Sequence, residues 1–578
     1  MKTKTTTLAS LLAITLTAAG QTPATGGIKA DFNGDGFADL AIGSPSEDFD
    51  SGLTTIKPVK NTGAVTVIYG SSIGLATYGA DGAPYSTTWH QNSAGVADTC
   101  KSGDLFGEAL AAGDINRDGF SDLVIGIPGE RDSAGKVVGA VQILFGSSAG
   151  LTSTGNSMVL GSTLKHVFRS VNGALSLVCA DFNGDGFADL AAEAEIASYP
   201  NFEPRVLFLQ GSASGPSSTN FQSIALPADV RFTLPGTTSY MCDLTFTAGD
   251  FNEDGRADLV VGAPFGSAGN VSMAGHVKVL FGTSTGPSLT GATLIHQDSP
   301  GVREQAAYND RFGASLAVGD FNGDRRHDLA VGVPFEDNLL SIEDNGIADG
   351  GCAHVFLGDG KQVSTAGSQL LMESVEFEPE LGILDFGPEP YDQNGTALAA
   401  GDFDGDGITD LAIGAPGDTV DEYAQFDRGS NQGSVIVFYG SATALGFGDF
   451  QFWTEALADP NAVVRDGDRF GASLTAADFG RHYNQLRFTE TIVGGRGTLE
   501  GVDVIPPCDL VIGIPGKDVG GASNAGAARA IYGYNTGLGI STFGYNPGPF
   551  PLSPGTSQLF HKNLTEVETD AEFSAELR

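Results

Sequence analysis

The sequence predicts an all-β fold: a seven-bladed β-propeller of four-stranded antiparallel blades, with the ring closed by pairing the C-terminal strand with the N-terminal blade. An aspartate-rich pattern of nine residues, followed by Leu and an apolar strand, occurs six times, first at residues 31–39. The copies, with a diverged seventh at Asp478, begin roughly 70 to 80 residues apart, so one repeat array replaces the several domains that 578 residues suggest. Most repeats also contain an apolar strand that ends in Phe-Gly or Tyr-Gly.

Residues 1–20 are predicted to be an export signal. Lys2 and Lys4 form a positive n-region, residues 8–18 an apolar core, and residues 18–20 a small-residue cleavage site. The apolar core is too short to span a bilayer, and no run of 18 apolar residues follows it. We therefore expect no transmembrane segment and an extracellular protein, either secreted or held at the cell surface, after removal of the signal.

Residues 25–578 are predicted to form the propeller. Each blade has a strand that often opens with Phe-Gly, the aspartate loop, a second apolar strand, a third strand such as residues 140–146 and a weaker fourth strand such as residues 292–297. The first blade, which begins near Ile28, lacks the Phe-Gly strand, and residues 572–577 resemble it. We expect this C-terminal strand to complete the first blade, which removes an exposed sheet edge.

The aspartate loops are predicted to bind calcium, which proteins hold with six to eight oxygen ligands. Positions 1, 3, 5 and 9 carry Asp or Asn, and position 6 is Gly in five copies, where a positive φ turns the chain around the ion. Position 7 varies freely, as expected if only its carbonyl is a ligand. The candidate ligands at positions 1, 3, 5, 7 and 9 are Asp31, Asn33, Asp35, Phe37 and Asp39; Asp114, Asn116, Asp118, Phe120 and Asp122; Asp181, Asn183, Asp185, Phe187 and Asp189; Asp250, Asn252, Asp254, Arg256 and Asp258; Asp320, Asn322, Asp324, Arg326 and Asp328; and Asp402, Asp404, Asp406, Ile408 and Asp410.

The alternative is a metal-free hairpin turn held by Asx side chains. In that case the unneutralised aspartates within each of the six loops would repel one another. About six structural Ca²⁺ sites are expected, and they are not of equal strength. In the fifth copy Arg325 replaces the glycine, which adds about 1 kcal/mol of backbone strain and a positive charge. In the seventh copy the counterpart of position 9 is Asp509, far downstream of Asp478, so no ordinary site is expected there. The third copy keeps its ligands but has residues 193–195 (Glu-Ala-Glu) in place of Gly-x-Pro.

The charge balance restricts the partners. The chain has 30 Lys and Arg against 70 Asp and Glu, a net charge of −40, so no nucleic-acid partner is expected. Bound cations or a basic ligand fit this charge. The five cysteines fit neither a zinc site nor a dense disulfide framework, and burial as small apolar residues is the default for them.

Phe-Gly, the aspartate loop and Gly-x-Pro together resemble the FG-GAP repeats of integrin α-subunit head domains and their bacterial relatives. The resemblance extends over nearly the whole chain, from about residue 25 to residue 578. It implies a seven-bladed propeller with calcium in its hairpins, and adhesion or ligand binding as its role. The expected partner is an extracellular protein or glycan, and the oligomeric state is left open.

Ligand binding is expected on the face opposite the calcium loops. The loops on that face are long; they join strands two and three of a blade, or strand four to strand one of the next blade. Two of these loops are acidic and carry a tyrosine: Asp418, Asp421, Glu422, Tyr423 and Asp427 in one, and Glu389, Tyr391 and Asp392 in the other. A basic or cation-bridged ligand would fit them, and so would a merely solvated, solubilising surface. The insertion at residues 481–507 is assigned to the calcium face.

No catalytic constellation is identified, so the protein is expected not to be an enzyme. Gly-x-Ser-x-Gly, a pattern of serine hydrolases, occurs at residues 70–74 and 146–150, but it recurs at the same point of the repeat, where a tight turn is needed. A secreted carbohydrate- or lipid-active propeller, hydrolase or lyase, stays the alternative, because carboxylate pairs are abundant.

Overall fold

The structure is a computed structural model, and its description covers residues 30–49, 58–75, 86–168, 175–198, 201–216, 218–233, 240–337, 348–372, 390–419, 431–443, 445, 450–459, 462–480, 488–493, 496–501, 507–517, 527–534, 537–538 and 557–561. The predicted export signal and the predicted closing strand at residues 572–577 lie outside this part of the chain.

Seven antiparallel sheets form the blades of a propeller, which confirms the predicted all-β, seven-bladed fold. The predicted pairing of the C-terminal strand with the first blade stays a prediction. Successive strands of a blade are hydrogen-bonded neighbours, as in a meander. Blades 1 to 3 contain β1 (Leu40–Ser44), β2 (Ala64–Ile68) and β3 (Ser86–Trp89); β4 (Leu110–Gly113), β5 (Asp122–Ile127), β6 (Ala140–Phe145) and β7 (Thr152–Leu160); and β8 (Leu177–Ala180), β9 (Asp189–Ser198), β10 (Asn201–Leu209) and β11 (Phe221–Ala225).

The remaining four blades repeat this order. They contain β14 (Thr245–Gly249), β15 (Asp258–Ala263), β16 (His276–Phe281) and β17 (Ser288–Ile295); β18 (Ser315–Gly319), β19 (Asp328–Val333), β20 (Cys352–Phe356) and β21 (Gln369–Leu371); β22 (Ala397–Gly401), β23 (Asp410–Ala415), β24 (Ser434–Phe438) and β25 (Phe450–Thr454); and β26 (Ser473–Ala477), β29 (Asp509–Ile514), β30 (Ala527–Ile531) and β33 (Ser557–His561). The fourth strand predicted at residues 292–297 is β17, which begins four residues earlier than predicted, at Ser288.

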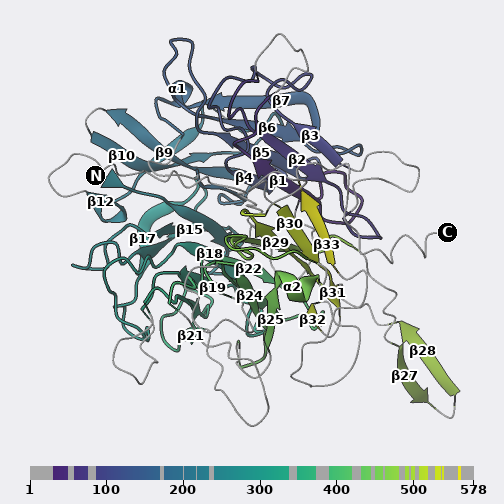
Figure 1. Cartoon of the computed structure of the whole chain (residues 1–578). Coiled ribbons are helices and arrows are strands. Elements are labelled where there is room, and N and C mark those ends of the chain that lie inside the picture. The colour runs from purple at the N-terminus through teal and green to yellow at the C-terminus, as the bar shows by residue number, and fades with distance from the viewer. Residues whose placement is uncertain are drawn as a thin grey trace.

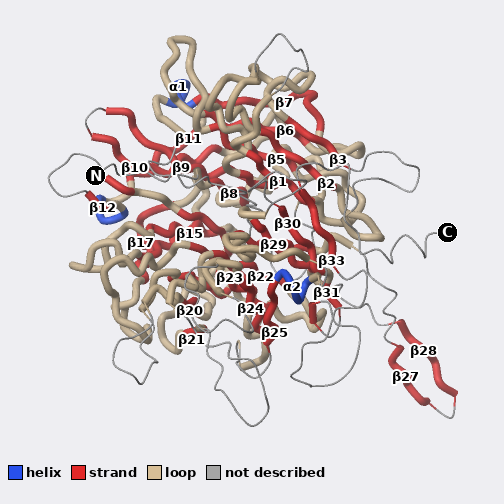
Figure 2. Tube along the Cα trace, in the orientation of Figure 1, coloured by secondary structure: helices blue, strands red, loops and turns tan. Residues whose placement is uncertain are grey.

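Helix is almost absent from the described chain, as Figure 2 shows. It is limited to α1 (Gly161–Leu164), α2 (Glu455–Ala458) and the 3₁₀ turn η1 (Ala228–Val230). No helix among the described residues is long and apolar enough to cross a membrane. Three small two-stranded sheets lie outside the blades: β12 (Phe232–Thr233) with β13 (Tyr240–Met241), β27 (Phe488–Val493) with β28 (Arg496–Gly501), and β31 (Gly533–Tyr534) with β32 (Gly537–Leu538).

The core lies between neighbouring blades, because each sheet is covered on both faces. The second strands, such as β5, β15 and β19, are buried at every residue, so they appear in the sequence as continuous apolar runs rather than alternating ones. The fourth strands are more exposed; β17 is buried only at Ile295. None of the five cysteines, all of which are described, forms a disulfide, and Cys179, Cys242 and Cys352 are buried.

The ring is closed by contacts between blade 7 and blade 1, whose strands lie side by side in Figure 1. The Ala38 amide donates to the Asp478 carbonyl (2.8 Å), and the Ser71 amide donates to the Phe479 carbonyl (3.2 Å). The Leu75 amide donates to the Tyr532 hydroxyl at 3.0 Å.

The same three bonds join blade 1 to blade 2. There the Ser121 and Ser147 amides donate to the Asp31 and Phe32 carbonyls, and the Leu151 amide donates to the Tyr69 hydroxyl at 3.0 Å. The closure between the first and last blades therefore has the geometry of an ordinary junction between blades.

A close approach at the closure requires a glycine. Gly74 has φ +91, and a Cβ there would lie 2.5 Å from the Tyr532 hydroxyl oxygen. We expect Gly74→Ala to lower the free energy of unfolding by about 2 kcal/mol through overpacking, in addition to its backbone strain. Gly135→Ala is the matched control, because Gly135 has φ +79 and open space around it. Urea denaturation of the two variants measures the difference; equal losses would contradict closure through Tyr532.

Candidate metal centres in the blade hairpins

Each complete aspartate loop is folded around the side chain of its first aspartate. In the first loop, Asp31 accepts hydrogen bonds from the Gly34 amide at 2.6 Å and from the Gly36 amide at 2.9 Å. Asn33 accepts from the Asp35 amide, and Asp35 accepts from the Phe37 amide, at 2.9 and 3.0 Å. These successive side-chain turns place the oxygens of positions 1, 3 and 5 along one short loop.

The aspartate at position 9 binds two backbone amides. Asp39 accepts from the Phe32 amide with Oδ2 (2.7 Å) and from the Gly70 amide with Oδ1 (2.9 Å), so it links the start of its loop to the end of β2, which corresponds to the third strand of the four-stranded blades. The same pair of hydrogen bonds recurs in every blade. The seven aspartates are Asp39, Asp122, Asp189, Asp258, Asp328, Asp410 and Asp509.

Asp509 confirms the predicted counterpart of position 9 in the broken seventh copy. It accepts from the Phe479 amide at 2.9 Å and from the Gly533 amide at 2.8 Å, although residues 481–507 separate it from Asp478. We call this pair of hydrogen bonds from the position 9 carboxylate the clamp of a blade. Among the described residues of the seventh loop, only Asp478, Phe479 and Gly480 lie directly before the insertion, and they include no carboxylate or amide side chain at positions 3 to 7. The carboxylate clamp of a blade is therefore separable from the set of candidate calcium ligands.

Position 8 connects the loops around the ring. Its amide donates to the carbonyl of position 1 in the preceding blade, as in Ala188 to Asp114 (3.0 Å) and Thr409 to Asp320 (2.9 Å). Between blades 4 and 5 the imidazole Nδ1 of His327 instead lies 2.9 Å from the Asp250 amide nitrogen and accepts its hydrogen bond. The hairpin loops are thus also the contacts between blades.

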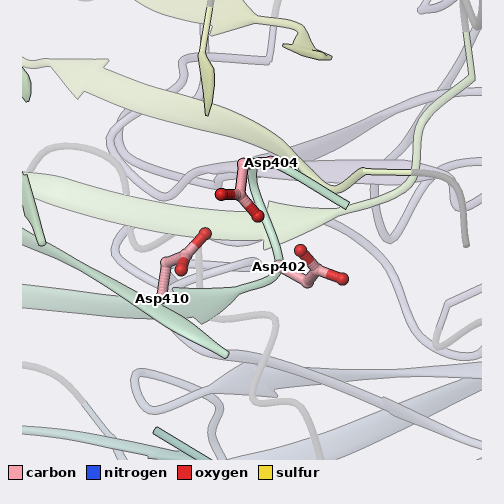
Figure 3. Close-up of side chains that lie close together, drawn as sticks. All are labelled: Asp402, Asp404 and Asp410. Atoms are coloured by element: carbon pink, nitrogen blue, oxygen red, sulfur yellow. The ribbon is translucent and has the colours of Figure 1, made fainter. Parts of the chain in front are cut away.

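The sixth loop gathers three carboxylates from Asp402, Asp404 and Asp410. One oxygen from each lies within 4.8 Å of the others, and Figure 3 shows them together around the hairpin. Burial raises the pKa of Asp402 to about 7 and that of Asp410 to about 8; two backbone amides oppose the shift at Asp410. Oxygen donors at this separation fit a hard divalent cation, whose charge would favour the ionised form.

Burial also raises the pKa of the position 9 aspartate in the other loops. Burial raises the pKa of Asp39 to about 8 and those of Asp122, Asp189, Asp258 and Asp328 to about 7. The neighbouring aspartates of positions 1 and 5 raise these pKa values further, although less than burial does. Each loop therefore holds carboxylates that repel one another.

Arginines modify the fourth and fifth loops. Arg325 keeps the loop geometry at φ +70, and its amide donates to Asp320 at 2.7 Å, so the non-glycine residue adopts the strained conformation that the sequence predicted. The guanidinium that pairs with a loop carboxylate belongs to Arg326, 3.4 Å from Asp324. Arg256 pairs with Asp254 in the same way in the fourth loop, at 3.3 Å. Sequence reasoning missed this pairing because it treated position 7 only as a source of a carbonyl.

The loops of the opposite face are only partly described, and they differ from the prediction where they are. Tyr391 is exposed, but Asp392 and Asp418 are buried, so these two carboxylates do not face solvent. Both residues also bond through their backbone carbonyls, Asp392 to the Gly417 amide and Asp418 to the Gly433 amide. The side chains at Asp421, Glu422, Tyr423, Asp427 and Glu389 lie outside the described residues.

The Gly-x-Ser-x-Gly pattern closes a turn. The residue before the central serine of the pattern makes the closing bond: the Ser71 hydroxyl donates to the Gly74 carbonyl, and the Ser147 hydroxyl donates to the Gly150 carbonyl, both at 2.7 Å. The two copies directly follow β2 and β6, at the same point of the repeat as the sequence predicted, and neither leads directly into a helix among the described residues.

The family comparison agrees with this geometry. The model of the FG-GAP repeat matches residues 28–68, 106–143, 244–280, 312–351 and 394–438, which are parts of blades 1, 2, 4, 5 and 6. The unmatched blades are the third, with Glu193 and Glu195 in β9, and the seventh, with its insertion. The chain thus contains FG-GAP repeats in five of its blades, and its seven-bladed propeller resembles the heads of integrin α subunits.

Individual relatives fall into two groups. Phosphatidylinositol-glycan-specific phospholipase D of Bos taurus is 25% identical over 486 residues, which cover 82% of this chain and 52% of the relative. Integrin alpha-PS5 of Drosophila melanogaster is 34% identical over 172 residues, 29% of this chain and 14% of the integrin. Human integrin alpha-IIb is 33% identical over 135 residues, 23% of this chain and 11% of the integrin. The chain thus spans about half the length of the phospholipase relatives.

The clamp and the candidate ligands are expected to respond differently to substitution. Asp509→Ala leaves two buried amides without an acceptor, at about 1–3 kcal/mol each, so it destabilises the protein equally with calcium and with EDTA. Asp406→Ala removes an exposed carboxylate at position 5, a candidate calcium ligand, and should destabilise the protein mainly in calcium. Thermal unfolding of both variants in each condition measures this; a calcium-independent effect of Asp406→Ala would contradict a metal role for position 5.

Proposed function

We propose that the hairpin loops of blades 1 to 6 bind structural calcium ions. The observation that carries the proposal is the repetition of one oxygen-rich loop, with a buried carboxylate whose pKa is raised to about 7 or 8, in six blades. Asp and Asn at positions 1, 3, 5 and 9 would hold the ion, with the position 7 carbonyl. The guanidinium groups of Arg256 and Arg326 compete for position 5, so the fourth and fifth sites are the weaker ones.

The proposed function of the protein is that of an extracellular, secreted or surface-held propeller that mediates adhesion or binds a protein or glycan ligand. Similarity to integrin α subunits supports a ligand-binding role. The net charge of −40 favours a basic ligand or one bridged through calcium. The ligand would bind the face opposite the hairpins, where the loops differ between blades.

A second candidate is a hydrolase, and the similarity to phosphatidylinositol-glycan-specific phospholipase D over 82% of the chain favours it. The substrate class would be the phosphatidylinositol-glycan of that relative's name. Since the chain covers about half of that protein, the match also fits a propeller that only binds such a lipid-linked glycan.

Calcium stabilisation should increase with pH. Without metal, the buried aspartates have folded-state pKa values of about 7 to 8 against 3.8 when unfolded, so the folded state binds more protons and loses stability as pH rises between these values. Calcium needs the ionised carboxylates and displaces those protons. The difference in Tm between calcium and EDTA should therefore be larger at pH 8 than at pH 5. No Tm loss on chelation at pH 8 would refute the calcium sites.

Ligand binding is tested with an array of glycans and matrix proteins, probed with the full chain in calcium and again in EDTA. The adhesion proposal expects calcium-dependent binding to a defined subset, with preference for basic proteins. In parallel, a phosphatidylinositol-glycan-anchored protein in detergent is incubated with the chain. Release of the anchored protein, without array binding, would replace the adhesion proposal by the hydrolase.

A further inference from the structure

Position 4 of the hairpin loops has a left-handed backbone in all six copies. The residues at this position, which have φ between +57 and +76, are Gly34, Arg117, Gly184, Glu253, Gly323 and Gly405. Glycine adopts this conformation freely, whereas other residues are strained in it. Arg117 and Glu253 are therefore the exceptions, and a strained residue that the fold retains points to a role for its side chain.

Both exceptions use their side chains to reach the hairpin of the next blade. Nη1 of Arg117 donates to the Asp185 carbonyl at 3.1 Å, and the guanidinium lies 5.8 Å from the centre of the Phe187 ring. Oε1 of Glu253 accepts a hydrogen bond from Nε of Arg326 at 3.1 Å. The strained residues thus link the second hairpin to the third and the fourth hairpin to the fifth.

The arginines at position 7 of the fourth and fifth hairpins are placed alike. Each points Nε at the preceding hairpin and Nη1 at the position 5 carboxylate of its own loop. Arg256 donates through Nε to the Asn183 carbonyl at 3.3 Å, and its Nη1 lies 3.3 Å from Asp254. Nη1 of Arg326 lies 3.4 Å from Asp324. In both loops the guanidinium therefore contacts a candidate calcium ligand.

The two arginines differ in their partner on the preceding hairpin. Arg256 meets a neutral backbone carbonyl, because position 4 of the third loop is Gly184, where a Cβ would lie 3.2 Å from Nε of the arginine. Arg326 meets the carboxylate of Glu253. A hydrogen bond between two charged groups is stronger than one to a neutral acceptor. Glu253 therefore draws a guanidinium away from a position 5 carboxylate, and the fourth hairpin has no equivalent acid to do so.

One oxygen of Asp324 is the object of this competition. Oδ1 accepts from the Arg326 amide at 2.9 Å, so Oδ2, which faces the guanidinium, is the oxygen left for an ion. The side chains of Arg326, Glu253 and Asp324 are 43%, 53% and 34% exposed. Both ion pairs are therefore modest and sensitive to salt. Because they share one guanidinium, loss of either acid leaves the guanidinium to the other.

We propose that Glu253, in the hairpin of blade 4, sets the calcium affinity of the hairpin of blade 5 by competing with Asp324 for the Arg326 guanidinium. The inference rests on the proposed calcium sites and adds a link between two of them. Glu253 is a positioning residue, since it acts on the fifth hairpin only through Arg326. Without such an acid behind Arg256, the fourth site is the weaker of the two.

The test is a double-mutant cycle on calcium binding by the full chain, measured by isothermal titration calorimetry at low salt. Glu253→Gln should weaken one site roughly twofold to fivefold, the size expected of an exposed ion pair, because the freed guanidinium pairs with Asp324. Arg326→Gln should strengthen the same site to a similar extent. In the Arg326→Gln background, Glu253→Gln should have no effect. Loss of the site in Asp324→Ala assigns it to the fifth hairpin.

Two controls separate this role from a structural one. Arg117→Gln alters the other strained residue at position 4, whose guanidinium donates to a backbone carbonyl, and should leave the affinity of the fifth hairpin unchanged. High salt should remove the effect of Glu253→Gln by screening both ion pairs. A structural defect at position 4 would instead persist in high salt and in the Arg326→Gln background. Circular dichroism confirms that each variant is folded.

The outcomes distinguish the link from the sites that it connects. If the chain binds calcium and Glu253→Gln matches the wild type, or keeps its effect without Arg326, the link is wrong and the hairpin sites stand. A wild-type chain that binds no calcium would refute the hairpin sites and the link with them.

Discussion

The structure depends on one interaction, the buried aspartate that closes each blade. Its two carboxylate oxygens bind the amide at the start of the hairpin and the glycine amide after the third strand, as Asp39 binds Phe32 and Gly70. One side chain therefore holds three of the four strands of a blade in register. All seven blades keep it, including the seventh, whose loop is interrupted by an insertion.

The clamp also explains why the hairpins suit a metal. Burying a carboxylate in every blade raises its pKa, and the neighbouring aspartates of the loop raise it further. A cation in the loop would remove both costs. Because the position 8 amides connect these loops to the preceding blade, a metal in a hairpin would stabilise the junction between blades as well as the blade itself.

The same need for a counter-charge recurs on the other face. Between blades 1 and 2, Lys101 pairs with the buried Glu130, and between blades 6 and 7, Lys517 pairs with the buried Glu455. The two lysines come from different positions of the repeat, although each meets the need of a buried acid for a partner of opposite charge.

The sequence by itself determined the blade number, the order of strands and the positions of the aspartate loops, because a pattern repeated six times reports local chemistry that each copy must satisfy. It also placed Asp509 correctly as the counterpart of position 9. Only the tertiary structure decided which charged side chains pair, such as Arg326 with Asp324 and Lys101 with Glu130. It also decided that Asp392 and Asp418 are buried. Lys101 and Glu130 are distant in the chain, and Asp392 and Asp418 lie on loops that vary between blades, so no periodicity in the sequence encodes them. Arg326 and Asp324 lie in one hairpin loop, but the repeat does not constrain the side chain at position 7.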